Sequence, residues 1–113
     1  MERGKIVYLS GLKTDSESCK NEFVCAELFL KQMGYVVLNP VEIFKELVKL
    51  NYEKSMQIRY RLVDISDIIF MVSGWQKSKG ATAELSYAKS LGKEVKYQDY
   101  YAPFRKVADD ENS

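Results

Sequence analysis

Residues 67–84, D-I-I-F-M-V-S-G-W-Q-K-S-K-G-A-T-A-E, decide the fold. The apolar run at their start predicts a buried strand, Gly74 marks a loop, and Gly80 opens a helix whose first turn is expected to carry Glu84. In open α/β sheets, ligands bind where loops at the carboxyl ends of strands meet helix N-termini. A loop hydroxyl and the Glu84 carboxylate in one crevice therefore predict a small-molecule site.

Length and charge narrow the classes of function. The 113 residues accommodate one domain with one modest core. Lys and Arg number 17, Asp and Glu number 16, and the net charge is +1, so we expect a small-molecule partner and no nucleic acid polymer. The chain contains no histidine, which removes Ser-His and Cys-His nucleophile pairs and the commonest metal ligand. We therefore expect no metal and no cofactor, and catalysis by carboxylates, hydroxyls, Lys, Arg or Tyr.

The cysteines and the apolar runs bear on the compartment. Cys19 and Cys25 do not form a CxxC motif, so we interpret them as reduced structural cysteines. The longest aliphatic run, residues 68–72, is far shorter than the roughly 18 apolar residues that a membrane helix needs. We expect a cytoplasmic protein without a membrane segment.

Strand patterns alternate with helix patterns along the chain. Strands are predicted at 5–10, 35–38, from Asp67 onward and at 94–97, and helices at 21–33, 52–65 and 80–91, with a short helix possible within 41–50. Residues 13–18 are predicted to form a polar loop. We expect one domain over residues 1–99 and an aromatic, then acidic, tail over residues 100–113.

This alternation predicts an α/β fold, a three-layer sandwich around a parallel, flavodoxin-like or Rossmann-like sheet of about four to five strands. The loops after the first and third strands should then lie side by side at the topological switch point. Residues 73–84 are therefore expected to face four residues of the first strand and its loop: Tyr8, Ser10, Gly11 and Lys13.

Three segments carry a family resemblance. K-I-V-Y-L-S-G (5–11), L-N-P (38–40) and residues 67–95 resemble the nucleoside 2-deoxyribosyltransferase-like superfamily. The chain is most similar to a small phage and bacterial branch, with the hallmark G-W-x-x-S-x-G-A-x-x-E at residues 74–84. The resemblance covers residues 5 to about 98.

The resemblance implies an N-glycosidic reaction. Glu84 would attack the anomeric carbon of a nucleoside and form a glycosyl-enzyme ester, which water or a second base resolves. Tyr8 would orient Glu84, and Asp67 joins them as a candidate catalytic residue. Ser78 stands where members that act on nucleoside 5′-monophosphates bind phosphate. The resemblance also implies a homodimer or higher homo-oligomer, for which Tyr100, Tyr101 and Phe104 offer a surface.

Each of these residues also has a purely structural interpretation. Ser78 is a suitable N-cap, and Asp67 before a buried run can bind local N–H groups. Tyr8 is an ordinary strand residue, and Trp75 is either a base-stacking ring or a cover over the core. The remaining candidates for phosphate binding are also ordinary loop, turn or strand residues: Ser10, Gly11, Lys13, Gly74 and Gly80.

Arg59 departs from the family pattern. Members usually carry an acidic residue there that handles the leaving base. Arg59 could pair with Glu84 or bind a second phosphate. The sequence thus leaves two main functions open, an N-glycosidase and a non-catalytic nucleotide-binding module, beside a purely structural domain in which Glu84 affects only stability.

Overall fold

The computed structural model describes residues 4–11, 17–43 and 49–101. Lys13, Phe104 and the rest of the predicted tail beyond residue 101 lie outside this part of the chain. The strands are β1 (Ile6–Ser10), β2 (Val36–Leu38), β3 (Ile68–Met71) and β4 (Glu94–Tyr97). The helices are α1 (Glu17–Gln32), α2 (Pro40–Ile43), α3 (Tyr52–Ile65) and α4 (Lys79–Ser90), with the 3-10 helices η2 (Trp75–Lys77) and η3 (Gln98–Tyr101).

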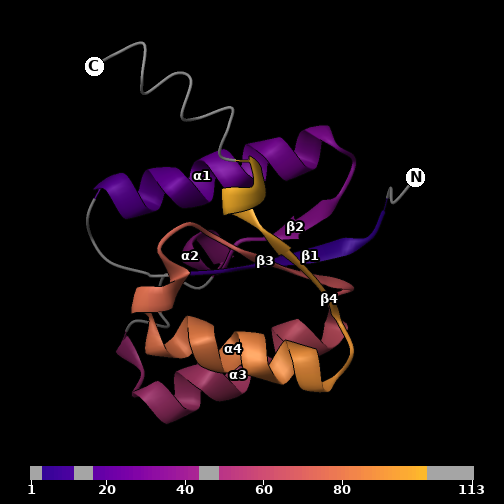
Figure 1. Ribbon diagram of the computed structural model, residues 1–113. Helices are drawn as coiled ribbons and strands as arrows, with labels where there is room; N and C mark the ends of the chain where they lie inside the picture. Colours follow the sequence, from indigo (N-terminus) through magenta and orange to yellow (C-terminus); the bar gives the residue numbers. More distant parts are fainter. Residues whose placement is uncertain (1–3, 12–16, 44–48, 102–113) are drawn as a thin grey trace.

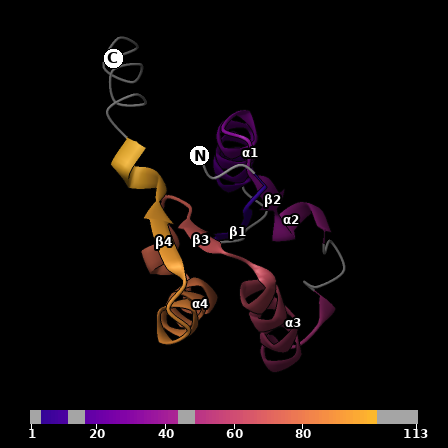
Figure 2. The same cartoon turned by 90° about the vertical axis from the view of Figure 1, so that its right-hand side faces the viewer.

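The four described strands form one parallel sheet in the order β2-β1-β3-β4. Helix α1 covers one face of the sheet, and α3 and α4 cover the other (Figures 1 and 2). The chain leaves β1 toward one face and leaves β3 toward the opposite face, so the switch point lies between these two neighbours. The predicted three-layer α/β sandwich is confirmed.

The bounds predicted for the helices and strands agree with the structure to different degrees. Helix α3 and strand β4 have the expected bounds. Helix α1 begins at Glu17, four residues earlier than expected, so the polar loop prediction for residues 13–18 is wrong at its end. The first turn of α1 carries no aliphatic or aromatic residue, and the hydrophobic period therefore gave no signal until Phe23.

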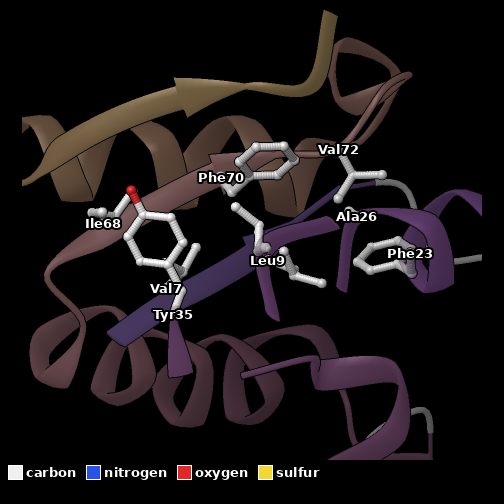
Figure 3. Close-up of a cluster of buried hydrophobic side chains, with 9 residues drawn as sticks. Val7, Leu9, Phe23, Ala26, Tyr35, Ile68, Phe70 and Val72 are labelled. Carbon is white, nitrogen blue, oxygen red and sulfur yellow. The ribbon is translucent and has the colours of Figure 1, made fainter. Parts of the chain in front are cut away.

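Alternation along β1 and β3 divides the core between the two faces of the sheet. The core on the α1 face is shown in Figure 3 and comprises Val7, Leu9, Phe23, Ala26, Leu30, Tyr35, Ile68, Phe70 and Val72. The core on the opposite face comprises Tyr8, Val63, Ile69, Met71, Ala81, Leu85 and Ala88. Val7 and Leu9 of β1 thus pack on the α1 side of the sheet, and Tyr8 and Ser10 point toward α3 and α4.

Polar contacts join α3 to α4. The Tyr87 hydroxyl donates to Asp64 Oδ1 at 2.5 Å, and Lys93 Nζ donates to the Asp64 carbonyl at 2.9 Å. The rings of Tyr60 and Tyr87 lie 4.5 Å apart. These contacts fix α3 against the helix that carries Glu84. Within the described residues, none of the helices is long and apolar enough to cross a membrane.

Gly11 is required by packing where β1 ends. A Cβ at this position would lie 2.9 Å from Val72 Cβ and 3.2 Å from the Phe23 ring. We expect Gly11→Ala to destabilise the protein by about 1–3 kcal/mol, because the neighbours must move apart. Urea unfolding measures this, with Gly80→Ala as the control, since its Cβ would meet nothing closer than 3.5 Å. Equal unfolding midpoints for the two variants would contradict this account.

Candidate active site

Glu84 is buried at the switch point and held by two hydroxyls of β1. The Tyr8 hydroxyl donates to Glu84 Oε2 at 2.6 Å, and Ser10 Oγ donates to Oε1 at 2.5 Å. All three residues are 0% exposed. Tyr8 and Ser10 are two residues apart on one strand, so their side chains emerge from the same face and reach the two oxygens of one carboxylate.

These hydrogen bonds suit an ionised carboxylate. A carboxylate only accepts hydrogen bonds, and each of its oxygens here receives one from a hydroxyl. Burial raises the pKa of Tyr8 well above its ordinary value, and the charge of Glu84 and the hydrogen bond to it add to this, while the positive charge of Arg59 opposes it. Tyr8 therefore remains a donor at neutral pH.

Glu84 lies in the second turn of α4, not in the first turn as we expected. The helix begins at Lys79 and its first turn contains no acidic residue. Because the dipole effect falls off within the first turn, it does not account for a carboxylate at this position. The contacts to Tyr8 and Ser10 do. Glu84 also lies four residues after Gly80, on the same face of the helix.

Ser78 caps α4. Its Oγ accepts a hydrogen bond from the Ala81 amide at 3.1 Å. The first amides of a helix have no intrahelical acceptor, so the N–H groups of Lys79 and Gly80 have no hydrogen-bond acceptor within α4. Lys77 and Lys79 are exposed beside the cap, and Lys79 Nζ lies 4.9 Å from the centre of the Tyr52 ring.

Arg59 is brought to the same helix end from α3. Its Nη1 atom lies 3.5 Å from the position that a Cβ on Gly80 would occupy. Among the described residues, no hydrogen bond or ion pair joins Arg59 to Glu84. The alternative in which Arg59 pairs with Glu84 is therefore not what the structure contains.

The other loop candidates have clear conformational or packing roles. Gly74 has φ of +90°, in the left-handed region that favours glycine. Trp75 packs against the core on the α4 face of the sheet, with its ring centre 6.0 Å from that of Tyr97. This position agrees with the interpretation of Trp75 as a cover over the core. Lys13 lies outside the described residues.

Asp67 is not brought to Glu84. Its Oδ2 accepts from the Ile6 amide at 2.8 Å, and its own amide donates to the Ile6 carbonyl at 2.8 Å. This contact fixes the start of β1 against β3. Ser10 lies four residues further along β1, about 13 Å from this end of the sheet. Asp67 thus occupies the end of the sheet opposite to the candidate site.

Asp67→Ala is expected to lower the free energy of unfolding by about 1 kcal/mol, through loss of one hydrogen bond where β1 and β3 begin. Any base release by the protein should keep its kcat and KM within about two-fold, because the site is one sheet length away. Asp67→Asn, which keeps an acceptor oxygen, is the control for stability. A large loss of turnover in Asp67→Asn at unchanged stability would show that Asp67 takes part in the chemistry.

The sequence interpretation missed the pairing of Ser10 with Glu84. We assigned Ser10 to phosphate, yet its hydroxyl is engaged by the carboxylate. The two-residue spacing from Tyr8 was the available signal. Tyr60 was also missed as a neighbour of the site: burial raises its pKa, and the charges of Tyr52 and Glu84 add to this. Among the described residues, His, Cys, Asp and Glu do not gather in groups of three or more that could hold a metal ion.

Comparison with known proteins gives a family and a fold. A family model described as a domain of unknown function (DUF4406) matches residues 5–97. A solved structure of a 2-desoxiribosyltransferase from Leishmania mexicana is similar, with a TM-score of 0.62 and 17% sequence identity over 82% of this chain. This chain spans 63% of the length of that one. No curated protein matches the chain.

Proposed function

This chain belongs to the DUF4406 family, and from its fold and its buried carboxylate we propose that it cleaves the N-glycosidic bond of a nucleoside 5′-monophosphate or a related nucleotide. The observation that carries the proposal is Glu84 held by Tyr8 and Ser10 at the switch point of the sheet. A carboxylate with both oxygens oriented is suited to covalent attack on a sugar. The name of the Leishmania protein, a 2-desoxiribosyltransferase, supports the same reaction class.

The proposed reaction has two steps at one carbon. A Glu84 oxygen forms a bond to the anomeric carbon while the bond to the base nitrogen breaks, and the base leaves with the electron pair. Water or a second base then bonds to that carbon, the ester bond breaks, and the Glu84 carboxylate is restored. With water, one of its protons replaces the sugar on the departed base; with a second base, the proton lost from its attacking nitrogen does so. Two displacements retain the anomeric configuration.

The phosphate of the substrate is assigned to the start of α4. The Ser78 Oγ accepts from Ala81 and keeps its own proton for a ligand oxygen. The amides of the first turn and the helix dipole favour an anion there, and Lys77 and Lys79 add positive charge. Tyr8, Ser10 and Glu84 form the catalytic group, in which Tyr8 and Ser10 position Glu84. Asp67 has no part in it.

Chromatography of free bases tests this function. Wild-type protein and Glu84→Ala are incubated with ribo- and deoxyribonucleoside 5′-monophosphates and with the corresponding nucleosides. We expect base release by the wild type from at least one monophosphate and none by the variant. Release at equal rates by both proteins would refute the role of Glu84, and the substrate consumed identifies the base and the sugar.

The second candidate function is a nucleotide-binding module without catalysis. Two observations favour it: Glu84 is 0% exposed, so substrate contact requires the covering groups to move, and Arg59 stands where the resemblance implies an acid. This alternative predicts no base release by the wild type, together with a rise in melting temperature when monophosphates are added.

Assembly and location belong to the same proposal. We place the protein in the cytoplasm as a homodimer or higher homo-oligomer. Tyr100 is 76% exposed and its ring stacks edge-on against that of Tyr97, with the centres 5.6 Å apart. An exposed aromatic ring on a rigid support is suited to a subunit contact.

A further inference from the structure

Arg59 lies on the inner side of α3, and no described residue forms an ion pair with it. Met56, Arg59 and Val63 recur at helical spacing, and the two apolar members are buried. The Arg59 side chain is partly buried, and its Nε atom is fully buried with no hydrogen-bond partner among the described residues. A buried donor without an acceptor is unfavourable. A ligand that supplies an acceptor oxygen would relieve this cost.

The nearby carboxylates are engaged elsewhere. Both oxygens of Glu84 accept hydroxyl hydrogen bonds. The Asp64 carboxylate binds the Tyr87 hydroxyl and the Arg61 guanidinium. In the described part of the chain, no salt bridge involves Arg59. Among the described residues, no carboxylate therefore neutralises the charge of Arg59, and an anion from outside the protein could do so.

Gly80 allows Arg59 to approach the cap of α4 closely. A carbon atom at its Cβ position would lie 3.5 Å from Arg59 Nη1, 3.5 Å from Met56 Sδ and 3.9 Å from Ser78 Oγ. Donors from two different elements thus converge on one point beside the first turn of α4. This convergence, together with the orphaned Nε, distinguishes the place from a helix N-terminus alone.

The distance from this point to Glu84 restricts the ligand. Gly80 and Glu84 lie on one face of α4, four residues or about 6 Å apart along the axis. A furanose whose anomeric carbon lies at Glu84 would reach this point with the arm that carries its 5′ oxygen. A 5′-phosphate would then lie between Arg59 and Ser78.

We propose that Arg59 binds the 5′-phosphate and thereby selects nucleoside 5′-monophosphates over nucleosides. This inference rests on the proposed function, because it takes its substrate class from there. Arg suits the task because a planar guanidinium can donate two N–H groups to a phosphate at once, and the Arg59 Nη1 atom already lies beside Gly80. Ser78 and the first amides of α4 complete the shell around the phosphate.

Isothermal titration with nucleoside 5′-monophosphates, the matching nucleosides and inorganic phosphate tests this inference. Arg59→Gln is expected to weaken monophosphate binding about 10- to 100-fold and to leave nucleoside binding unchanged, as for the loss of one charge-assisted contact. Arg61→Gln is the matched control, since Arg61 lies two residues away with a side chain 78% exposed and paired with Asp64. It should bind as the wild type does.

Two further variants distinguish a loss of phosphate binding from misfolding. Arg59→Lys keeps the charge and loses the planar fork, so we expect an intermediate loss. Gly80→Ala should fold, because its Cβ makes ordinary contacts, yet the added methyl group would crowd a phosphate bound between Arg59 and Ser78 and should weaken monophosphate binding selectively. Unchanged monophosphate affinity in folded Arg59→Gln or Gly80→Ala, an equal loss for nucleoside and monophosphate, or no monophosphate binding by the wild type would each overturn the inference.

Base release separates this inference from the proposed function. If monophosphate binding depends on Arg59 but the wild type releases no base, the phosphate site is supported and the proposed N-glycosidic cleavage is refuted. If the wild type and Arg59→Gln release base with the same KM, the cleavage is supported and the role of Arg59 in phosphate binding is refuted.

Discussion

Replacing Glu84 by Gln is expected to abolish base release, by at least about 10⁴-fold, while the protein remains folded. The amide has nearly the same shape as the carboxylate, and it can accept from one β1 hydroxyl and donate to the other. It is too weak a nucleophile to form the ester, so the loss falls on kcat. Circular dichroism and the release assay on the same sample measure both expectations.

Trapping separates a nucleophile from a carboxylate that only supports the fold. Wild-type protein that is denatured during turnover should carry one sugar phosphate on the peptide containing Glu84, detected by mass spectrometry, and Glu84→Gln should carry none. Glu84→Ala adds a test of structure, because it leaves two buried hydroxyls facing a cavity and should cost about 2–4 kcal/mol. A destabilised Ala variant beside a fully active Gln variant would assign Glu84 to the fold.

The sheet could be predicted from the sequence because its central strands are apolar and are followed by residues typical of loops. The run 68–72 is apolar on every position, as a central parallel strand requires; Ser10 and Gly11 mark the end of β1, and Ser73 and Gly74 follow this run. Helix α1 was harder. Val24 and Leu28 break its apolar stripe, and the structure leaves them 45% and 57% exposed. Apolar residues on an outer face carry no information about which face is buried.

The site was predictable in its position, and the resemblance anticipated the contact of Tyr8 with Glu84, but the contact of Ser10 with Glu84 was not predicted. The strand order makes β1 and β3 neighbours, so the side chains at their carboxyl ends that face α4 lie close to that helix. Which hydroxyl reaches the carboxylate depends on the packing of α4 against β1, which no local pattern specifies. Arg59 illustrates the same limit, because its spacing with Met56 and Val63 marks it as inward-facing, but only the structure shows that its Nε lacks an acceptor.

Removing the hydroxyls that hold Glu84 is the second change with a large expected effect. Tyr8→Phe and Ser10→Ala should each lower kcat about 10- to 100-fold with little change in KM, because a displacement of the nucleophile on the order of 1 Å costs this much. Each also leaves one buried Glu84 oxygen without a donor, which costs about 1–3 kcal/mol of stability. Ser10→Thr keeps the hydroxyl and should recover most of the rate.

The double variant decides how the two hydroxyls act. Because they orient one carboxylate, the loss in Tyr8→Phe/Ser10→Ala should be smaller than the product of the single losses. Tyr87→Phe is the matched control: it removes a hydroxyl bond of 2.5 Å to another carboxylate, that of Asp64, so it should lower stability and leave kcat unchanged. If Tyr87→Phe slowed base release as much as Tyr8→Phe, the rate would follow general stability, and positioning of Glu84 would be refuted.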